Sequence, residues 1–227
     1  VQHITGDLPM YQSEIHSHTR LLFIMTSPDD MLVYCRPACI KQWPLIVLPK
    51  LTLARTAKRI RMGLDELKHG FTSRIIGPDT AALVLPHHGL QTPTPAWPQV
   101  QLPLVKAGHI AVLAQSPSIT ACIRDWVSGR QVGLSHLICV GGSSDVNIAD
   151  LVDTLIQDPH CRALVIQMDR LRLPARFISA LRSCTRQKPV MVLHTGRVRD
   201  FQTEQDPEDD TFLDRELLYQ AAITRSG

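Results

Sequence analysis

The sequence predicts an α/β protein built from open parallel sheets, and three features of the chain carry this prediction. Short, continuous apolar runs alternate with segments of helical apolar spacing. Two of these runs are followed at once by helix-starting residues, Thr26-Ser-Pro-Asp29 and Ser116-Pro-Ser118. A proline-rich stretch, 86–103, divides the chain into two such halves. Consecutive strands joined through one helix pair in parallel with right-handed crossovers, so each half predicts a parallel sheet.

The first half alternates in this way from residue 21 onward. The run Leu21-Leu-Phe-Ile-Met25 contains no polar residue, which is typical of a strand buried on both faces. The expected elements are strands at 21–25, 45–48 and ending at 75–76, and helices at about 29–40 and 53–68. The helix at 53–68 is basic and amphipathic, and we expect its arginines and lysine to face solvent.

The stretch 86–103 contains five prolines, at positions 86, 93, 95, 98 and 103. Proline fixes φ and has no backbone N–H to donate, so we expect this stretch to be an irregular surface linker. It also supplies the predicted domain boundary. The expected domains are residues 1–85, a linker over 86–107, and residues 108–227.

The second half gives the clearest alternation. The expected strands are 109–114, 137–140, 163–167 and 190–194, in one parallel sheet with helices on both faces. The helix after Ser116 is expected to turn Ile119, Ile123, Trp126 and Val127 inward. Asn147 is a good N-cap for the next helix, and a third helix should run from Pro174 to about Arg186.

Charge and hydropathy exclude several classes of protein. Lys and Arg number 24 against 21 Asp and Glu, a net charge of +3, which argues against a disordered polyelectrolyte or a nucleic-acid coat. The basic helix around Arg176 carries a single aromatic residue, Phe177, and no series of aromatic residues interleaved with its arginines for stacking on bases, so no nucleic-acid partner is expected. No apolar run approaches the ~20 residues that span a bilayer, so no membrane association is expected. Because the chain does not begin with Met, we expect a processed product or a piece of a longer protein.

The six cysteines indicate free thiols of a cytoplasmic protein, because a disulfide framework is typical of short secreted chains. Cys35 and Cys39 lie one helical turn apart and could join His16 and His18 at a metal. The spacing of a zinc site is missing, so no metal is predicted.

Ligands of open parallel sheets bind beyond the carboxyl ends of the strands. Four loops there are candidates: Thr26-Ser27, Gln115–Ser118, Gly141–Asp145 and Asp169-Arg170. In the second loop, Ser116 and Ser118 either bind an anion at a helix N-terminus or simply cap that helix. Asp169 either orients a reactive group or pairs with Arg170 or Arg172. His194 lies at a strand end, and we expect it to have a structural role.

Five segments, in order, resemble the motifs of one superfamily, the nucleoside-diphosphate-forming acyl-CoA synthetases, which includes succinyl-CoA synthetase and ADP-forming acetyl-CoA synthetase. They are Arg74–Asp79 (R-x-x-G-P-N), Gly108–Ser118 (apolar strand, then S-Q-S-G-A), Val140–Asp150 (G-N-x-x-D-V-x-x-x-D), Gln157–Cys161 (E-D-P-x-T) and Lys188–Arg197 (K-P-V-x-x-x-K-x-G-R). The resemblance covers about 74–227, more loosely from about 20. Trp126 and the segments 177–182 and 183–188 fit the synthetase-like region of bacterial protein lysine acetyltransferases best.

The resemblance implies part of a Rossmann-like CoA-binding domain followed by a flavodoxin-like succinyl-CoA ligase domain. It implies CoA, acyl-CoA or a nucleotide as ligand, and an ATP-grasp or N-acetyltransferase domain as partner; self-association stays open. The implied phosphate or ligand contacts are Gln115, Ser116, Ser118, Gly142 and Asp169, and the implied CoA contacts are Thr26, Ser27 and Pro78.

The departures from the family pattern predict a loss of phosphoryl relay. Pro117 replaces a loop glycine, Asp79 replaces an Asn, and Asp169 stands where the family has a Glu that supports a phosphorylated histidine. That histidine should follow Arg197, yet residues 198–227 contain none. We therefore expect a regulatory binding module. The alternatives are a diverged synthetase subunit working with an ATP-grasp chain, and a pure interaction module using the basic helix and the acidic segment 204–216.

Overall fold

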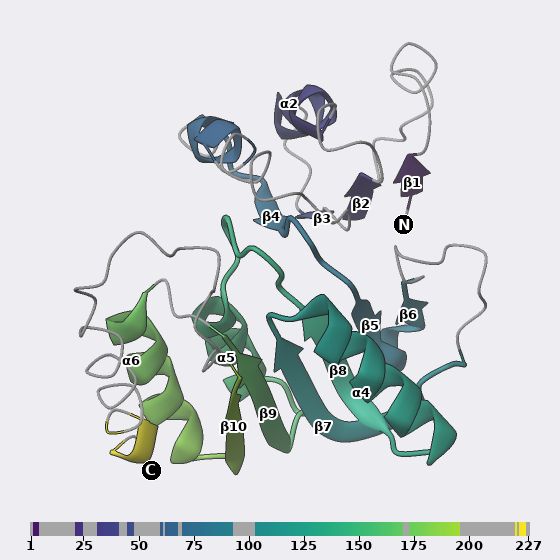
Figure 1. Cartoon of the computed structure of the whole chain (residues 1–227), viewed down its shortest axis with the longest axis vertical. Coiled ribbons are helices and arrows are strands. Elements are labelled where there is room, and N and C mark those ends of the chain that lie inside the picture. Colours follow the sequence, from purple (N-terminus) through teal and green to yellow (C-terminus); the bar gives the residue numbers. More distant parts are fainter. Residues whose placement is uncertain are drawn as a thin grey trace, which may run out of the picture.

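The computed structural model describes residues 2–4, 21–24, 31–40, 45–47, 60, 62–67, 70–92, 103–169, 173–195, 221 and 223–225. Within these residues the chain forms two sheets with helices packed against them (Figure 1). The expectations for Thr26, Ser27, His16, His18, Arg170, Arg172 and the acidic segment 204–216 lie outside the described residues.

The first sheet is parallel throughout. Its strands follow one another in space as in sequence: β1 (Gln2–Ile4), β2 (Leu21–Ile24), β3 (Leu45–Val47) and β4 (Arg74–Ile76). Helix α2 (Met31–Ile40) follows β2, as expected, and residues 62–67 form part of the helix expected at 53–68. These two helices touch closely, since a Cβ added at Gly63 would lie 2.4 Å from a Leu32 methyl carbon.

The second sheet has six strands in the order β10-β9-β7-β8-β5-β6. Its parallel part consists of β7 (Ala107–Ala114), β8 (Leu134–Cys139), β9 (Ala163–Met168) and β10 (Val190–His194). All three pairings among these strands are parallel, which confirms the predicted four-stranded sheet.

The remaining two strands of this sheet correct the expected linker. β5 (Leu83–Leu85) pairs antiparallel with β8, and β6 (Leu90–Gln91) pairs antiparallel with β5. The 3₁₀ turn η1 (Pro86–His88) joins them, so the expectation that 86–103 is irregular is wrong for 86–91. Pro86 lies at the start of the turn, where no N–H is needed, and Gly89 closes it at φ 65°. The sheet thus begins before residue 86, and the domain limits at 85 and 107 stay a prediction.

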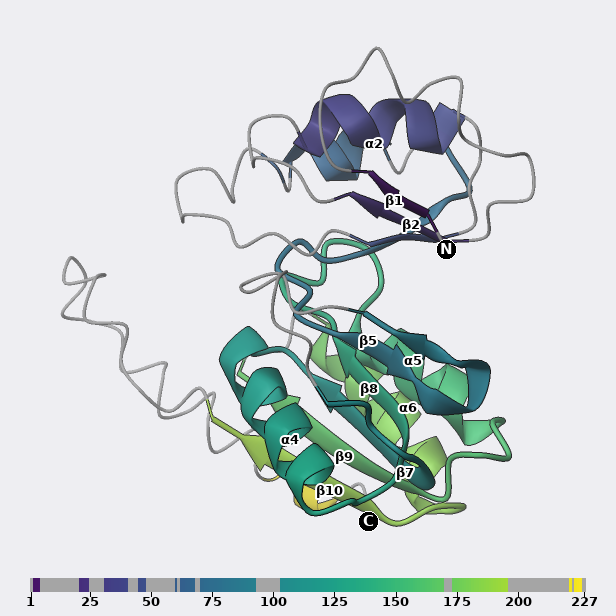
Figure 2. The ribbon, with the colours of Figure 1, turned by 90° about the vertical axis from the view of Figure 1, so that its right-hand side faces the viewer.

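Helices cover both faces of the second sheet (Figure 2). Helix α4 (Pro117–Gly129) packs on one face, where Val127 meets the buried Val112 and Leu137. Helices α5 (Ile148–Ile156) and α6 (Pro174–Thr185) pack on the other face over a larger apolar core that includes Val152 and Phe177. Asn147 caps α5 as predicted, in a reciprocal capping box with Asp150.

The inner face of α4 differs from the prediction at one large residue. Trp126 is 50% exposed, and the guanidinium of Arg130 lies 4.8 Å from its ring centroid. Arg124 is buried instead, because its guanidinium donates a hydrogen bond to the carbonyl of Thr92, at 2.7 Å. That bond ties α4 to the end of the β5–β6 hairpin.

Five of the six cysteines are buried free thiols, as expected, whereas Cys122 is exposed on α4. Within the described part of the chain, no helix reaches the length and apolarity needed to cross a membrane.

Candidate functional site

The order of the second sheet reverses between β7 and β9, which makes their carboxyl ends the switch point of the fold. The chain leaves β7 through α4 toward β8 on one side, whereas β9 and β10 lie on the other. In open α/β sheets, ligands bind in the crevice outside such a switch point. Gln115 and Asp169 follow the two central strands at this position.

Gln167, near the end of β9, is the centre of a hydrogen-bond network at the switch point. Its side chain is fully buried. The amide Oε1 accepts from the backbone N–H groups of Gln115 and Ser116, at 3.1 and 2.9 Å. Its Nε2 donates to the Asp169 carboxylate and to the Thr195 hydroxyl, at 2.8 and 2.7 Å. The Gln167 amide therefore uses both of its N–H donors and both acceptor positions of its oxygen, and it joins the loops that follow β7, β9 and β10.

Asp169 is bound from several sides. Its Oδ1 accepts from the Thr195 hydroxyl as well as from Gln167. Its backbone N–H donates to Gln115 Oε1 at 2.7 Å, and its carbonyl accepts from His194 Nε2 at 3.2 Å. Gln115, Gln167, Asp169, His194 and Thr195 therefore form one unit, which we call the switch-point network.

In the loop after β7, Ser116 caps helix α4, which is one of the two roles expected for it. Ser116 is the N-cap of α4, and its Oγ accepts from the Ile119 N–H at 3.3 Å. Pro117 occupies the first helical position, and Ser118 is exposed in the first turn. An anion-binding role for Ser116 and Ser118 stays a prediction, and the N–H of Ser116 already donates to Gln167.

Gly142 and Pro78 meet where the first half of the chain contacts the second. The N–H groups of Gly142, Ser144 and Val146 donate to the carbonyls of Pro78, Gly77 and Ile75, at 2.7, 3.0 and 3.0 Å. Residues 75–78 thus run along the loop 141–146, and we call this contact the seam. Gly141 adopts φ 54°, and a Cβ there would lie 2.2 Å from the Pro78 carbonyl oxygen, so the seam requires glycine.

Asp79 and Cys139 lie beside the seam. Asp79 adopts φ 68°, a left-handed conformation that Asn and Asp tolerate better than most residues. The Cys139 thiol lies 3.7 Å from the carbonyls of both Asp79 and Gln115. Burial raises the pKa of this thiol above its ordinary value, so it stays protonated and structural.

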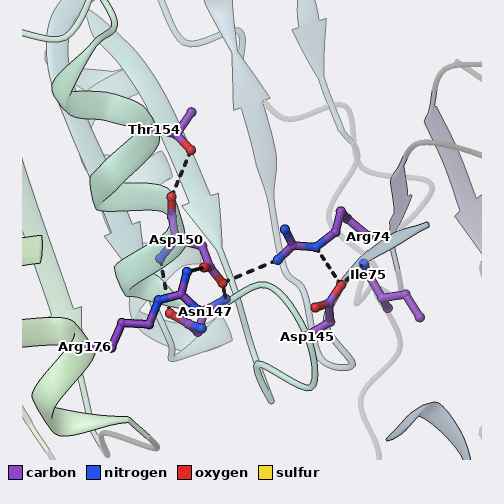
Figure 3. A network of polar contacts seen from close by, with 7 residues as sticks. All are labelled: Arg74, Ile75, Asp145, Asn147, Asp150, Thr154 and Arg176. Atoms are coloured by element: carbon purple, nitrogen blue, oxygen red, sulfur yellow. Dashed lines mark hydrogen bonds and ion pairs between the residues drawn. The ribbon is translucent and has the colours of Figure 1, made fainter. Parts of the chain in front are cut away.

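A charge network crosses the seam (Figure 3). Arg74, on β4, places its Nε 3.0 Å from Asp145 Oδ2 and its Nη2 3.5 Å from Asp150 Oδ2. The Ile75 N–H donates to the same Asp145 oxygen at 2.8 Å. Arg176, on α6, pairs with the other oxygen of Asp150. Strand β4 is thereby tied to the first turn of α5 and to α6.

The structure brings some of the predicted site residues together and separates others. Gln115, Ser116 and Asp169 meet at the switch point, whereas Gly142 and Pro78 lie at the seam. Sequence reasoning missed Gln167 and Thr195. The available signal was a polar residue inside the apolar run Ala163–Met168. Among the residues that the structure describes, no group of three or more His, Cys, Asp or Glu side chains is arranged to hold a metal ion.

A family model described as "Succinyl-CoA ligase like flavodoxin domain" matches residues 107–227. The α subunit of an ADP-forming acetate–CoA ligase (I) from Pyrococcus furiosus is 24% identical over 201 residues, which are 87% of this chain and 42% of that protein. An ADP-forming acetate–CoA ligase from Methanocaldococcus jannaschii is 21% identical over 164 residues, 72% of this chain and 22% of that protein. The chain thus spans less than half the length of these relatives.

Solved structures share the fold. A dinucleotide-forming acetyl-coenzyme A synthetase 1 of Ca. Korarchaeum cryptofilum superposes with a TM-score of 0.75 at 17% identity, covering 91% of this chain and 44% of that one. The ATP citrate lyase of Methanothrix soehngenii, solved with citrate and coenzyme A, gives a TM-score of 0.66 at 12% identity, covering 93% and 36%.

Proposed function

The chain belongs to the succinyl-CoA ligase-like flavodoxin domain family, and from that membership we propose that it is a catalytically degenerate, regulatory module that binds CoA, acyl-CoA or a nucleotide. Its homology to the α subunits of ADP-forming acetyl-CoA synthetases makes it an acyl-CoA synthetase-like module. The loss of phosphoryl relay and the regulatory role are our proposal.

One observation carries the proposal: the Asp169 carboxylate is engaged inside the switch-point network. In the superfamily pattern, this position supports a phosphorylated histidine. Here its Oδ1 accepts from the Gln167 amide and the Thr195 hydroxyl, and the sequence has no histidine in 198–227. A phosphoryl relay needs a nucleophile that takes up the phosphoryl group and releases it again. A threonine phosphate is too stable for that purpose, so Thr195 does not replace the histidine.

We place the ligand at the switch point and along the seam. The residues proposed for phosphate or other ligand contacts are Gln115, Ser116, Ser118, Gly142 and Asp169. Those proposed for CoA are Thr26, Ser27 and Pro78. The α4 N-terminus favours a negatively charged group, although Pro117 removes one backbone donor there. We therefore expect weak binding, with dissociation constants on the order of millimolar.

The partner that we propose is an ATP-grasp chain or domain, or an N-acetyltransferase domain of the same parent protein, in the cytoplasm. Since the relatives that match the chain are much longer than it is, the remainder of such a parent would carry the ATP-dependent or acetyl-transfer chemistry. We propose the division into units at 1–85, 86–107 and 108–227 within that parent.

A second candidate is an active synthetase subunit, and one observation favours it. The Pyrococcus furiosus relatives are named as α subunits of ADP-forming acetate–CoA ligases, which implies a further subunit in those enzymes. An active subunit would have to form a phosphoenzyme, whereas the degenerate module would not.

Isothermal titration with CoA, acetyl-CoA, ADP and phosphate tests the binding. We expect saturable heat with at least one of them at millimolar concentration, and weaker binding after Asp169→Ala. Asp153→Ala, an exposed carboxylate on α5, is the matched control and should bind as the wild type does. Absence of heat with all four ligands would overturn the binding proposal.

A further inference from the structure

Five of the ten histidines meet at the amino ends of the parallel strands, opposite to the switch point. They come from four parts of the chain: His87 and His88 from η1, His109 from β7, His136 from β8 and His160 from the segment before β9. We call these five residues the histidine cluster. None of them belongs to the candidate site described above.

The exposed members of the cluster stack on one another. The rings of His87 and His160 are nearly parallel, with their centroids 4.1 Å apart. The ring centroids of His109 and His87 lie 6.3 Å apart, and His88 meets His160 edge-on at 6.5 Å. Neutral imidazoles pack in this way, whereas two imidazolium rings so close together repel each other.

Two of these rings also form hydrogen bonds that need only one ring proton. His87 Nε2 lies 2.8 Å from the carbonyl oxygen of Gly108, and His109 Nδ1 lies 3.2 Å from the carbonyl oxygen of His160. Since a carbonyl only accepts, the ring nitrogen donates in both cases. The neutral cluster therefore ties η1 to the start of β7, and β7 to the segment before β9.

His136, the buried member, is held in the neutral form. Its Nε2 donates to Asp158 Oδ2 at 3.2 Å, and its Nδ1 is buried with no hydrogen-bond partner. A second proton would place a charge and an unpartnered N–H in the interior. Burial lowers the pKa of His136 below its ordinary value, and His88, His87 and His160 lower that pKa further, whereas Asp158 raises it.

The groups around His136 offer little to balance added positive charge. Asp158 is the carboxylate beside it, and its other oxygen already accepts from the His160 N–H at 2.7 Å. The Lys188 ammonium binds the Asp158 carbonyl at 2.9 Å and brings another positive charge. Burial raises the pKa of the neighbouring Cys161 thiol, so that group stays neutral. A proton added to His136 therefore meets little compensating negative charge.

We propose that the histidine cluster is an acid-sensitive latch, which in its neutral form holds η1 against the starts of β7 and β9 and, when protonated, releases it. The far end of the hairpin is fixed by contacts that do not titrate in this range. Gln91 exchanges two hydrogen bonds of 2.9 Å with Val105, and Arg124 binds the Thr92 carbonyl. Release is therefore confined to about residues 85–90.

Proton linkage gives the direction in which pH shifts the latch between its closed and open forms. Opening of η1, which contacts β8, moves His87 and His88 away from His136 and exposes it more, so the opened form binds more protons than the closed form below the ordinary pKa of about 6.5. Acid favours opening as the pH falls from about 6.5 through the folded pKa, and the latch is unaffected above that range.

Amide hydrogen exchange, measured by NMR on the chain at pH 7.5 and 5.5 and corrected for intrinsic rates, tests the latch. We expect the protection of the amides of Leu85 and of His87 to Leu90 to fall at the lower pH, because the lowered pKa of His136 makes acid favour the open form. The amides of Val112 and Val165, in the centre of the sheet, should keep their relative protection. Equal protection of 85–90 at both pH values would overturn the proposal.

Variants of exposed histidines separate the latch from general acid sensitivity. The double variant His87→Gln with His160→Gln removes the stacked pair at the surface and two of the neighbours that lower the pKa of His136, so it should reduce the pH dependence. His194→Gln, at the opposite end of the sheet, is the control and should keep it. The proposal is wrong if the double variant keeps the full pH dependence, or if His194→Gln abolishes it.

Discussion

Gln167 is the residue on which the candidate site depends most. Its buried amide is the acceptor for two backbone N–H groups after β7 and the donor to Asp169 and Thr195. Gln167→Leu leaves these groups without their partner in a buried place, and we expect a loss of about 2–4 kcal/mol in the free energy of unfolding. Urea unfolding measures it.

The matched control is Gln187→Leu, because that side chain is exposed beyond α6. It should change the free energy of unfolding by less than about 0.5 kcal/mol. Equal effects of the two substitutions would show that the switch-point network does not stabilise the fold.

The sequence predicts individual site residues only where a general rule applies to their position in the chain. Gln115 and Asp169 follow buried strands, and the rule on strand ends identifies them from the sequence. Thr195 meets Asp169 across 26 positions, and this contact depends on the register of β9 and β10, in which His194 pairs with Met168. Periodicity does not determine such a register, because β10 is apolar from Val190 to Leu193 even though Met191 and Leu193 are exposed.

At the scale of elements, the seam depends on a glycine. Gly141→Ala would have to keep φ 54° and place its Cβ against the Pro78 carbonyl. We expect a loss of at least about 1–3 kcal/mol, measured by thermal or urea unfolding. Gly129→Ala, in the last turn of α4 with open space around it, should be neutral or stabilising. A neutral Gly141→Ala would contradict the close approach of the two segments.

The helices and the four parallel strands followed from apolar periodicity and from caps such as Asn147. The hairpin of β5 and β6 did not, because its strands are only three and two residues long and adjoin a proline. Such short segments contain too few residues to show an alternating pattern, and the pairing of β5 with β8 is a tertiary contact. The inward turn of Arg124 in α4 has the same origin, since its partner, the Thr92 carbonyl, lies on a distant segment.

At the scale of the whole molecule, the charge network ties the two sheets together. Arg74 is half exposed, so Arg74→Gln should cost no more than about 1 kcal/mol. Asp145→Ala also removes the acceptor of the Ile75 N–H and should cost about 1–3 kcal/mol. A double-mutant cycle by urea unfolding measures the coupling between Arg74 and Asp145. A coupling of zero would show that the network does not link the sheets, and Arg182→Gln, an exposed arginine on α6, serves as the control.

We propose that this synthetase-like module keeps a ligand site and has lost phosphoryl relay. The most direct test incubates the chain with labelled ATP, or with acetyl-CoA and labelled phosphate, and analyses the protein on an alkaline gel. Our account predicts no protein-bound label and no ATP formed from acetyl-CoA, ADP and phosphate, because residues 198–227 offer no histidine and Asp169 is engaged by Gln167 and Thr195. Acid-labile, alkali-stable label on His194, lost in His194→Gln, would contradict it and identify the chain as an active synthetase subunit.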